Sequence, residues 1–426
     1  MSKSANSGLE QVTDLVAEIL MVGLILPCLL WPYLLFRPDG GHLPLAIILK
    51  ATVNRPITAV IGLPVGVLAV AVAFRLKGFR GGLIALIGLL FTIGTMVQYQ
   101  FDSAMILPWL AFLLCLVVTG EARVTITAFA YVMLVVNVVT GAVAYAMHYH
   151  QFPAKVVGLR ASDLSGSPLL FSPLCLLTIC GSAALILSTS KLRMRVAALT
   201  VALIAVVMQV LTFTRAGWIA TVVALAAGMG KRRKPSRVWL LIAVLIVIVG
   251  AFMVRADGRI SRIAHERSIT GRIYIWALAG KAILRHPVMG LSSEEAKQLQ
   301  RDTNVYLTLK GYTAIPGSAK SAYLDFAIAY GVPFLMLIIV LCAVLAQLIY
   351  SALARPSLPP GHQVISWWAI FSLFGLAAEG LVEDTLFFHG NTLPVTTVLL
   401  SLLGLAAGIS ITPYYHTTKA ELIPDD

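Results

Sequence analysis

The sequence Thr270-Gly271-Arg272-Ile273-Tyr274-Ile275-Trp276 lies in the one long polar segment of a mostly apolar chain, residues 255–319. This segment holds ten Lys and Arg residues against five Asp and Glu residues, and apolar blocks precede and follow it. We therefore expect the functional site to lie where the polar segment meets the apolar blocks.

The composition of the whole chain is that of a helical membrane protein. It has 426 residues, of which 59% are hydrophobic and 12% are charged, and its mean hydropathy is +0.89. A soluble domain carries about twice that share of charge. Apolar runs long enough to cross a hydrocarbon core of about 30 Å recur along the chain. They are continuous rather than alternating, which disfavours a β-barrel.

The sequence predicts an all-α integral membrane fold with about twelve transmembrane helices and one large periplasmic loop that contains short helices. Residues 1–254 are expected to form spans one to nine, residues 255–319 the loop, and residues 320–426 spans ten to twelve with a short cytoplasmic tail. The spans are expected near residues 15–36, 56–75, 81–99, 104–119, 124–147, 168–188, 194–213, 216–230, 237–254, 330–351, 364–383 and 393–412.

Basic residues in the short loops predict the orientation. They follow spans two, six and eight, which places all three of these loops on one side, and the positive-inside rule makes that side cytoplasmic. The residues are Arg75, Lys77, Arg80, Lys191, Arg193, Arg195, Lys231, Arg232, Arg233, Lys234 and Arg237. The loop at 255–319 then faces the outside. In a bacterium that side is the periplasm, so the protein would be expected in the inner membrane with its active site facing the periplasm.

The net charge of +13 is only partly explained by this topology. The periplasmic loop is itself basic, and long loops escape the positive-inside rule. Two interpretations remain open: a solvated basic surface, or a site for a ligand that carries phosphates at the outer membrane boundary. Nucleic acid is not expected as a partner, and the five Cys and eight His residues show no metal-binding spacing.

Arg215 is the first candidate site residue. The apolar stretch around it is too long for one span, so it must turn at Thr212–Arg215, which puts Arg215 at the start of the next helix. Free backbone N–H groups at a helix start favour an anion, and an Arg side chain can bind phosphate oxygens in a bidentate way. Thr212 and Thr214 add hydroxyl donors. The alternative is an Arg that extends from a helix end to the membrane surface.

Arg272 is the second candidate. Thr270 is a suitable N-cap for a helix that stops before Pro287. On this helix Arg272 shares its face with Ile275, Trp276, Ala279 and Ile283, so it is expected to point toward the bundle. The alternative role is a cation–π contact with Trp276.

Two further groups flank the next spans. Lys320, Tyr323 and Asp325 lie at the mouth of span ten, where Lys320 can pair with phosphate or with Asp325, or where Lys and Tyr act as interfacial anchors. Glu379 lies within an apolar run, which is costly, and Glu383 follows one turn later. Either carboxylate can take a proton from an acceptor hydroxyl or form salt bridges with the basic residues.

Three of these stretches together resemble the O-antigen ligase/polymerase superfamily, membrane glycosyltransferases of the GT-C kind that act on undecaprenyl-diphosphate-linked sugars. The first is Thr212–Trp218, an Arg at the end of a span. The second is Gly271–Trp276 followed by His286–Gly290, an Arg…Trp helix that leads to Pro-x-x-Gly. The third is Tyr323-Leu324 with Tyr330-Gly331-Val332, an aromatic-Leu…Gly motif that opens the next span.

The resemblance implies that Arg215 and Arg272 hold the donor diphosphate and that neither a metal nor another cofactor is needed. Lys320-Ser321 stand where ligases that attach O-antigen to lipid A-core usually have a His-Asn pair. This departure favours a polymerase of the Wzy type, as in xanthan-type exopolysaccharide clusters. A protonated Lys is a poor general base at neutral pH, so Lys320 would act through its position and charge.

The predicted function is therefore transfer of a growing glycan from undecaprenyl diphosphate to a sugar hydroxyl of another lipid-linked repeat unit. Arg215, Arg272, Glu383 and Glu379 are the expected catalytic residues, and Thr212, Thr214, Lys320, Tyr323 and Trp276 are expected to bind substrate. The alternatives are a ligase that moves lipid-linked glycan to another acceptor, and a flippase or transporter of lipid-linked sugar. Expected partners are the bilayer, the lipid-linked oligosaccharide, a chain-length regulator and a flippase.

Overall fold

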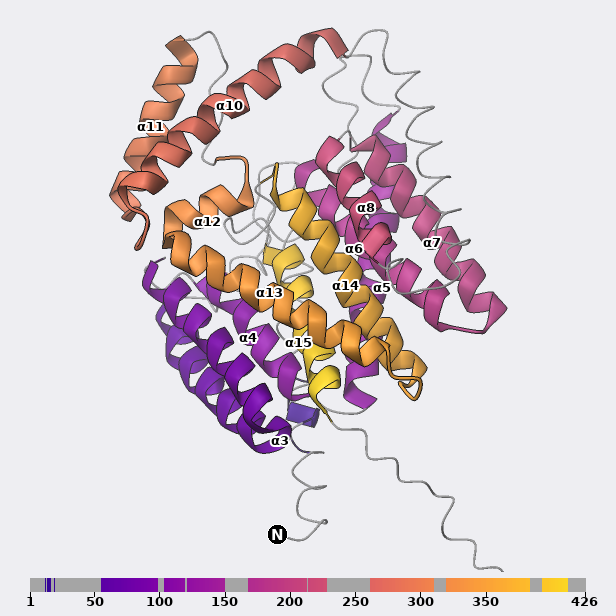
Figure 1. Cartoon of the computed structure of the whole chain (residues 1–426). Helices are drawn as coiled ribbons and strands as arrows, with labels where there is room; N and C mark the ends of the chain where they lie inside the picture. Colours follow the sequence, from indigo (N-terminus) through magenta and orange to yellow (C-terminus); the bar gives the residue numbers. More distant parts are fainter. Residues whose placement is uncertain are drawn as a thin grey trace, which may run out of the picture.

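The computed structural model shows a helical membrane protein (Figure 1). It describes residues 55–98, 103–118, 121–149, 168–212, 214–227, 261–309, 319–383 and 393–412, and a few positions between 12 and 19. These residues contain no β-strand, and five of their helices are long and apolar enough to cross a membrane. The predicted all-α membrane class is confirmed, whereas the number of spans stays a prediction. The expected span at 237–254 and nearly all of the one at 15–36 lie outside the described residues.

The first described helix, α3 (Arg55–Gln98), joins the two spans expected at 56–75 and 81–99. It is bent at Gly78, whose φ of 66° and ψ of −167° are not helical. A positive φ is readily adopted by glycine and costs other residues energy. Gly78 therefore divides the helix where the sequence predicts a turn.

The remaining helices of the bundle coincide with predicted spans to within a few residues. They are α4 (Ser103–Val117), α5 (Glu121–Tyr149), α6 (Pro168–Ser188), α7 (Leu192–Leu211), α8 (Arg215–Ala227), α13 (Val332–Leu353), α14 (Pro360–Gly380) and α15 (Leu393–Ile411). The predicted turn at Thr212–Arg215 separates α7 from α8, and Arg215 is the first residue of α8, as expected.

The polar segment forms α10 (Ser261–Arg285) and α11 (Ser293–Leu309), and α12 (Ala322–Tyr330) follows it. The prediction that Thr270 caps the first of these helices is wrong, because α10 begins at Ser261 and Thr270 lies inside it. The residues before Thr270 include no Gly or Pro back to Ser261, so nothing in them stops the helix. The predicted end before Pro287 is confirmed.

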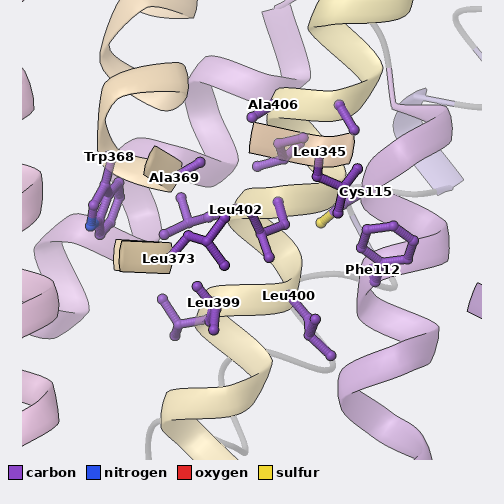
Figure 2. Close-up of a cluster of buried hydrophobic side chains, with 14 of the residues drawn as sticks. Phe112, Cys115, Leu345, Trp368, Ala369, Leu373, Leu399, Leu400, Leu402 and Ala406 are labelled. Atoms are coloured by element: carbon purple, nitrogen blue, oxygen red, sulfur yellow. The ribbon is translucent and has the colours of Figure 1, made fainter. Parts of the chain in front are cut away.

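A large apolar core joins α4, α13, α14 and α15 (Figure 2). The side chains that meet there include Phe112, Cys115, Leu345, Trp368, Leu373, Leu399 and Leu402. The helices α4 and α15 can approach closely because Gly404 and Gly408 have no Cβ. A Cβ on Gly404 would lie 2.4 Å from the Phe112 carbonyl oxygen, and one on Gly408 would lie 2.6 Å from the Leu116 carbonyl oxygen. Small residues spaced by four allow this contact between membrane helices.

Two long-range hydrogen bonds define one end of the bundle. The Lys77 ammonium donates to the Thr412 hydroxyl at 2.7 Å, and the Arg355 guanidinium donates to the Ser410 carbonyl at 2.9 Å. The bend of α3, the connection from α13 to α14 and the end of α15 therefore lie together. Helix α14 runs from this end to the opposite one, where it meets α12 and the polar segment (Figure 1).

Candidate active site

Arg272 points toward the bundle, as the sequence predicts. Its Nη1 donates to the Val382 carbonyl at 2.6 Å, and its Nη2 donates to Glu383 Oε1 at 2.7 Å. Both acceptors lie directly after α14. The Arg272 side chain is 28% exposed and that of Glu383 is 9% exposed. The ion pair therefore fixes a partly covered cation at this end of α14.

The predicted inward face of α10 is confirmed by its neighbours. Ile275 and Ala279 are buried with Leu307 of α11 and with Ala319. On the same face, Trp276 Nε1 donates to the Ala319 carbonyl at 2.9 Å. This contact orients the indole ring and joins α10 to the turn that precedes α12.

Lys320 lies in that turn with a left-handed backbone. Its φ is 54°, and no other non-glycine residue in the described part of the chain has a positive φ. This conformation costs an L-residue about 1–2 kcal/mol, so neighbouring contacts must maintain it. One of them is a hydrogen bond of 2.7 Å from the Ala319 N–H to Asp325 Oδ1. Strained residues held in this way occur often at functional sites.

The residues after Lys320 bind the end of α14. The Ala322 N–H donates to the Glu383 carbonyl at 3.2 Å, and the Ser321 hydroxyl donates to the Gly380 carbonyl at 3.4 Å. The Tyr323 hydroxyl donates to the Ala377 carbonyl at 2.8 Å. Burial raises the pKa of Tyr323 to about 12, so this phenol stays protonated and keeps its donor.

The turn between α7 and α8 is held by its own polar side chains. Thr212 and Thr214 are buried and their hydroxyls bond each other. Gln209 Nε2 donates to the Gly217 carbonyl at 3.0 Å, and Gln209 Oε1 accepts from the Thr221 hydroxyl at 2.7 Å. This network fixes where α8 starts. The side chain of Arg215 lies outside the described residues, so the structure places Arg215 through its backbone alone.

Glu379 connects α14 to the start of α8 through Ser172 of α6. The Ser172 hydroxyl donates to Glu379 Oε1 at 3.3 Å. Gly217 leaves the space for Ser172, because a Cβ there would lie 2.1 Å from the Ser172 oxygen. Glu379 is buried, and its Oε2 has no hydrogen-bond partner among the described residues. A buried carboxylate of this kind is costly in a membrane protein and indicates a functional group.

The end of α14 and the residues directly after it therefore connect the two halves of the predicted site. Glu383 pairs with Arg272, and Glu379, one turn earlier, bonds Ser172, which packs against Gly217 of α8. The arrangement places one guanidinium and two carboxyl groups at this end of α14. Asp384 and His389, which follow Glu383 in the sequence, lie outside the described residues. Among the described residues, no group of three His, Cys, Asp or Glu side chains could hold a metal ion.

Two of the motifs quoted from the sequence contact each other. Gly290 has a φ of 71° and lies against the end of α12, and Gly331 has a φ of 85° and lies against Val288. A Cβ on Gly290 would lie 2.5 Å from the Ile328 carbonyl oxygen, and one on Gly331 would lie 2.1 Å from that of Val288. Hydrogen bonds from Leu291 N–H to Ile328 and from Val332 N–H to Pro287, of 2.7 Å and 2.8 Å, complete the contact. The Pro-x-x-Gly motif thus positions α10 against the start of α13.

Sequence reasoning missed Ser172 and Gln209. Both are buried polar residues inside apolar helices, and that isolation is the signal that could have identified them. Their partners could not be identified this way, because Ser172 bonds a residue 207 positions away.

The described helices and the polar segment define a helical membrane protein. Residues 200–339 match the model of a family described as O-antigen ligase. This match confirms the resemblance to the O-antigen ligase/polymerase superfamily that the sequence motifs indicate. The matched residues contain α8, α10 and the Lys320 turn. No curated protein matches the chain.

Proposed function

We propose that this protein is a polysaccharide polymerase. It transfers a growing glycan from undecaprenyl diphosphate to a sugar hydroxyl of another lipid-linked repeat unit, at the periplasmic face of the inner membrane. The observation that carries the proposal is the convergence of Arg272, Glu383, Glu379 and the start of α8 on one end of α14.

Arg272 and Arg215 bind the diphosphate of the donor. Val382 and Glu383 take two of the five N–H donors of the Arg272 guanidinium, which leaves donors for phosphate oxygens. Glu383 also preorients the guanidinium, so little reorganisation is needed as charge develops on the leaving group. The first backbone N–H groups of α8 add a second favourable position for an anion.

The reaction is a displacement at the anomeric carbon of the donor sugar. The acceptor hydroxyl oxygen forms the new glycosidic bond while the bond from the anomeric carbon to the phosphate oxygen breaks. The hydroxyl proton passes to a carboxylate, for which Glu379 and Glu383 are the candidates, and undecaprenyl diphosphate leaves with the electron pair. Lys320 contributes its charge to substrate binding, whereas Thr212 and Thr214, whose buried hydroxyls bond each other, hold the start of α8 in place.

Purified protein tests this proposal directly. With lipid-linked repeat units in detergent it should form polymer and release undecaprenyl diphosphate, and a transporter would form none. Arg215→Ala and Arg272→Ala should each abolish polymer while the amount of protein in the membrane is unchanged. Normal polymer length and yield from both variants would contradict the assignment of Arg215 and Arg272 to the site. Because arginines supply the positive charge, EDTA should leave the polymer yield unchanged.

A ligase is the second candidate, because the matching family is described as O-antigen ligase. Deletion of the gene distinguishes the two reactions. Loss of a polymerase leaves single repeat units on the lipid carrier, whereas loss of a ligase leaves long lipid-linked chains.

A further inference from the structure

Residues 284–289, which we term the tip, form an exposed apolar projection at the end of α10. All six residues are exposed. Leu284 and Met289 are each 81% exposed and Val288 is 59% exposed. Three large apolar side chains this close together indicate an interaction surface rather than a solvated turn.

The tip is held rigidly at its base. The Pro287 carbonyl accepts from the Val332 N–H at 2.8 Å, and the Leu291 N–H donates to the Ile328 carbonyl at 2.7 Å. Gly290 and Gly331 allow the two backbones to touch. The tip therefore has a fixed position beside the first turn of α13.

That position is the end of a membrane span. Helix α13 is one of the five helices that are long and apolar enough to cross a membrane. It exposes Met336, Ile339, Val340 and Val344 along its length, as a lipid-facing helix does. Because Val332 begins this helix and bonds Pro287, the tip lies at the depth where the hydrocarbon region begins.

Two cations lie at the end of α10, Lys281 just before the tip and Arg285 within it. Lys281 and Arg285 are exposed and four residues apart, so they share one face of the last turns of α10. Basic residues next to apolar anchors favour the phosphate groups of lipid headgroups. The nearby acid Glu295 is engaged by the Ser292 N–H and hydroxyl, and His286 Nε2 lies 3.8 Å from its Oε1.

We propose that the tip inserts into the lipid leaflet at this end of the bundle. Leu284, Val288 and Met289 enter the acyl region, and Lys281 and Arg285 contact lipid phosphates. The surface continues the lipid-facing side of α13, which is why lipid is the occupant rather than a second protein. Since Arg272 is on the same helix, the contact sets the height of that guanidinium above the membrane. The insertion itself does not depend on the reaction proposed above.

Lipid-attached quenchers test the insertion. Met289→Cys in the full chain is labelled with an environment-sensitive dye and reconstituted into vesicles of phosphatidylethanolamine and phosphatidylglycerol. Three of the described native cysteines are buried and Cys342 is partly buried, and the unmodified chain serves as the labelling blank. The emission of the dye should shift to shorter wavelength, and lipids with a doxyl group near the headgroup should quench it. Gln300→Cys, exposed on α11, should show neither effect.

Equal behaviour at the two positions would overturn the proposal. So would shielding of position 289 that is insensitive to lipid quenchers and disappears when vesicles hold single copies, since a second copy would then cover the tip. A substitution within the tip gives an independent measurement. Val288→Asp should abolish quenching of the label at position 289, whereas Val305→Asp, which changes an exposed valine of α11, should preserve it.

Discussion

At the scale of single residues, the Arg272–Glu383 pair joins α10 to the end of α14. A carboxylate that is nearly covered by protein needs its cation, since removal of one partner leaves a charge without compensation. The guanidinium reaches Val382 and Glu383 with two different nitrogens, which a single ammonium cannot do in the same geometry. A lysine at position 272 would therefore keep the charge but not both of these contacts.

We expect Arg272→Lys to lose most of the polymer-forming activity although it keeps the positive charge. The lysine cannot satisfy the Val382 carbonyl, Glu383 and a phosphate at once. Polymer length on gels and release of lipid diphosphate measure the effect, and Arg301→Lys, on the exposed side of α11, serves as the control. Full activity of Arg272→Lys would show that the planar guanidinium is not used.

Lys320 allows backbone strain to be separated from side-chain function. Lys320→Gly should leave the free energy of unfolding unchanged or raise it by up to about 1 kcal/mol, because glycine adopts φ 54° without strain. The same variant should reduce polymer formation if the lysine contacts the substrate. Thermal unfolding in detergent and the polymer assay, measured on the same preparation, test this. A variant that is as stable and as active as the original chain would exclude Lys320 from the site.

At the scale of elements, the contact between the turn after α10 and the start of α13 depends on glycine. Gly331→Ala and Gly290→Ala should each destabilise the protein by about 2 kcal/mol or more, since a Cβ would meet backbone oxygens at 2.1 Å and 2.5 Å and both φ values are positive. The matched control is Gly280→Ala in α10, where nothing lies within 4 Å. That substitution should stabilise by about 0.5–1 kcal/mol. Equal unfolding temperatures for the three variants would contradict this account.

At the scale of the whole molecule, the two ends of the bundle should face opposite compartments. Arg193, in the first turn of α7, and Gln300, on α11, are both exposed. Each is replaced by cysteine in a separate variant, Arg193→Cys and Gln300→Cys. In spheroplasts, whose inner membrane is intact, a membrane-impermeant maleimide should label position 300 and not position 193. Inverted vesicles should give the reverse pattern. Labelling of both positions from one side would contradict the periplasmic location of the site.

The sequence by itself determined the membrane class, the positions of most described helices and the inward face of α10, because these follow from hydropathy and helical period, which are local properties. It also predicted the turn at Thr212–Arg215, since one apolar stretch was too long for a single span. It failed at Thr270, where a good capping residue was outweighed by helix-forming residues before it.

Only the tertiary structure decided which polar groups meet. Arg272 contacts Glu383 across 111 positions, and Ser172 contacts Glu379 across 207 positions. Neither helical period nor residue type specifies such a partner, because helices of similar hydropathy can pack in several orders. The close approaches at Gly217 and Gly331 select the packing in which the Arg272 helix and the start of α8 reach the same end of α14.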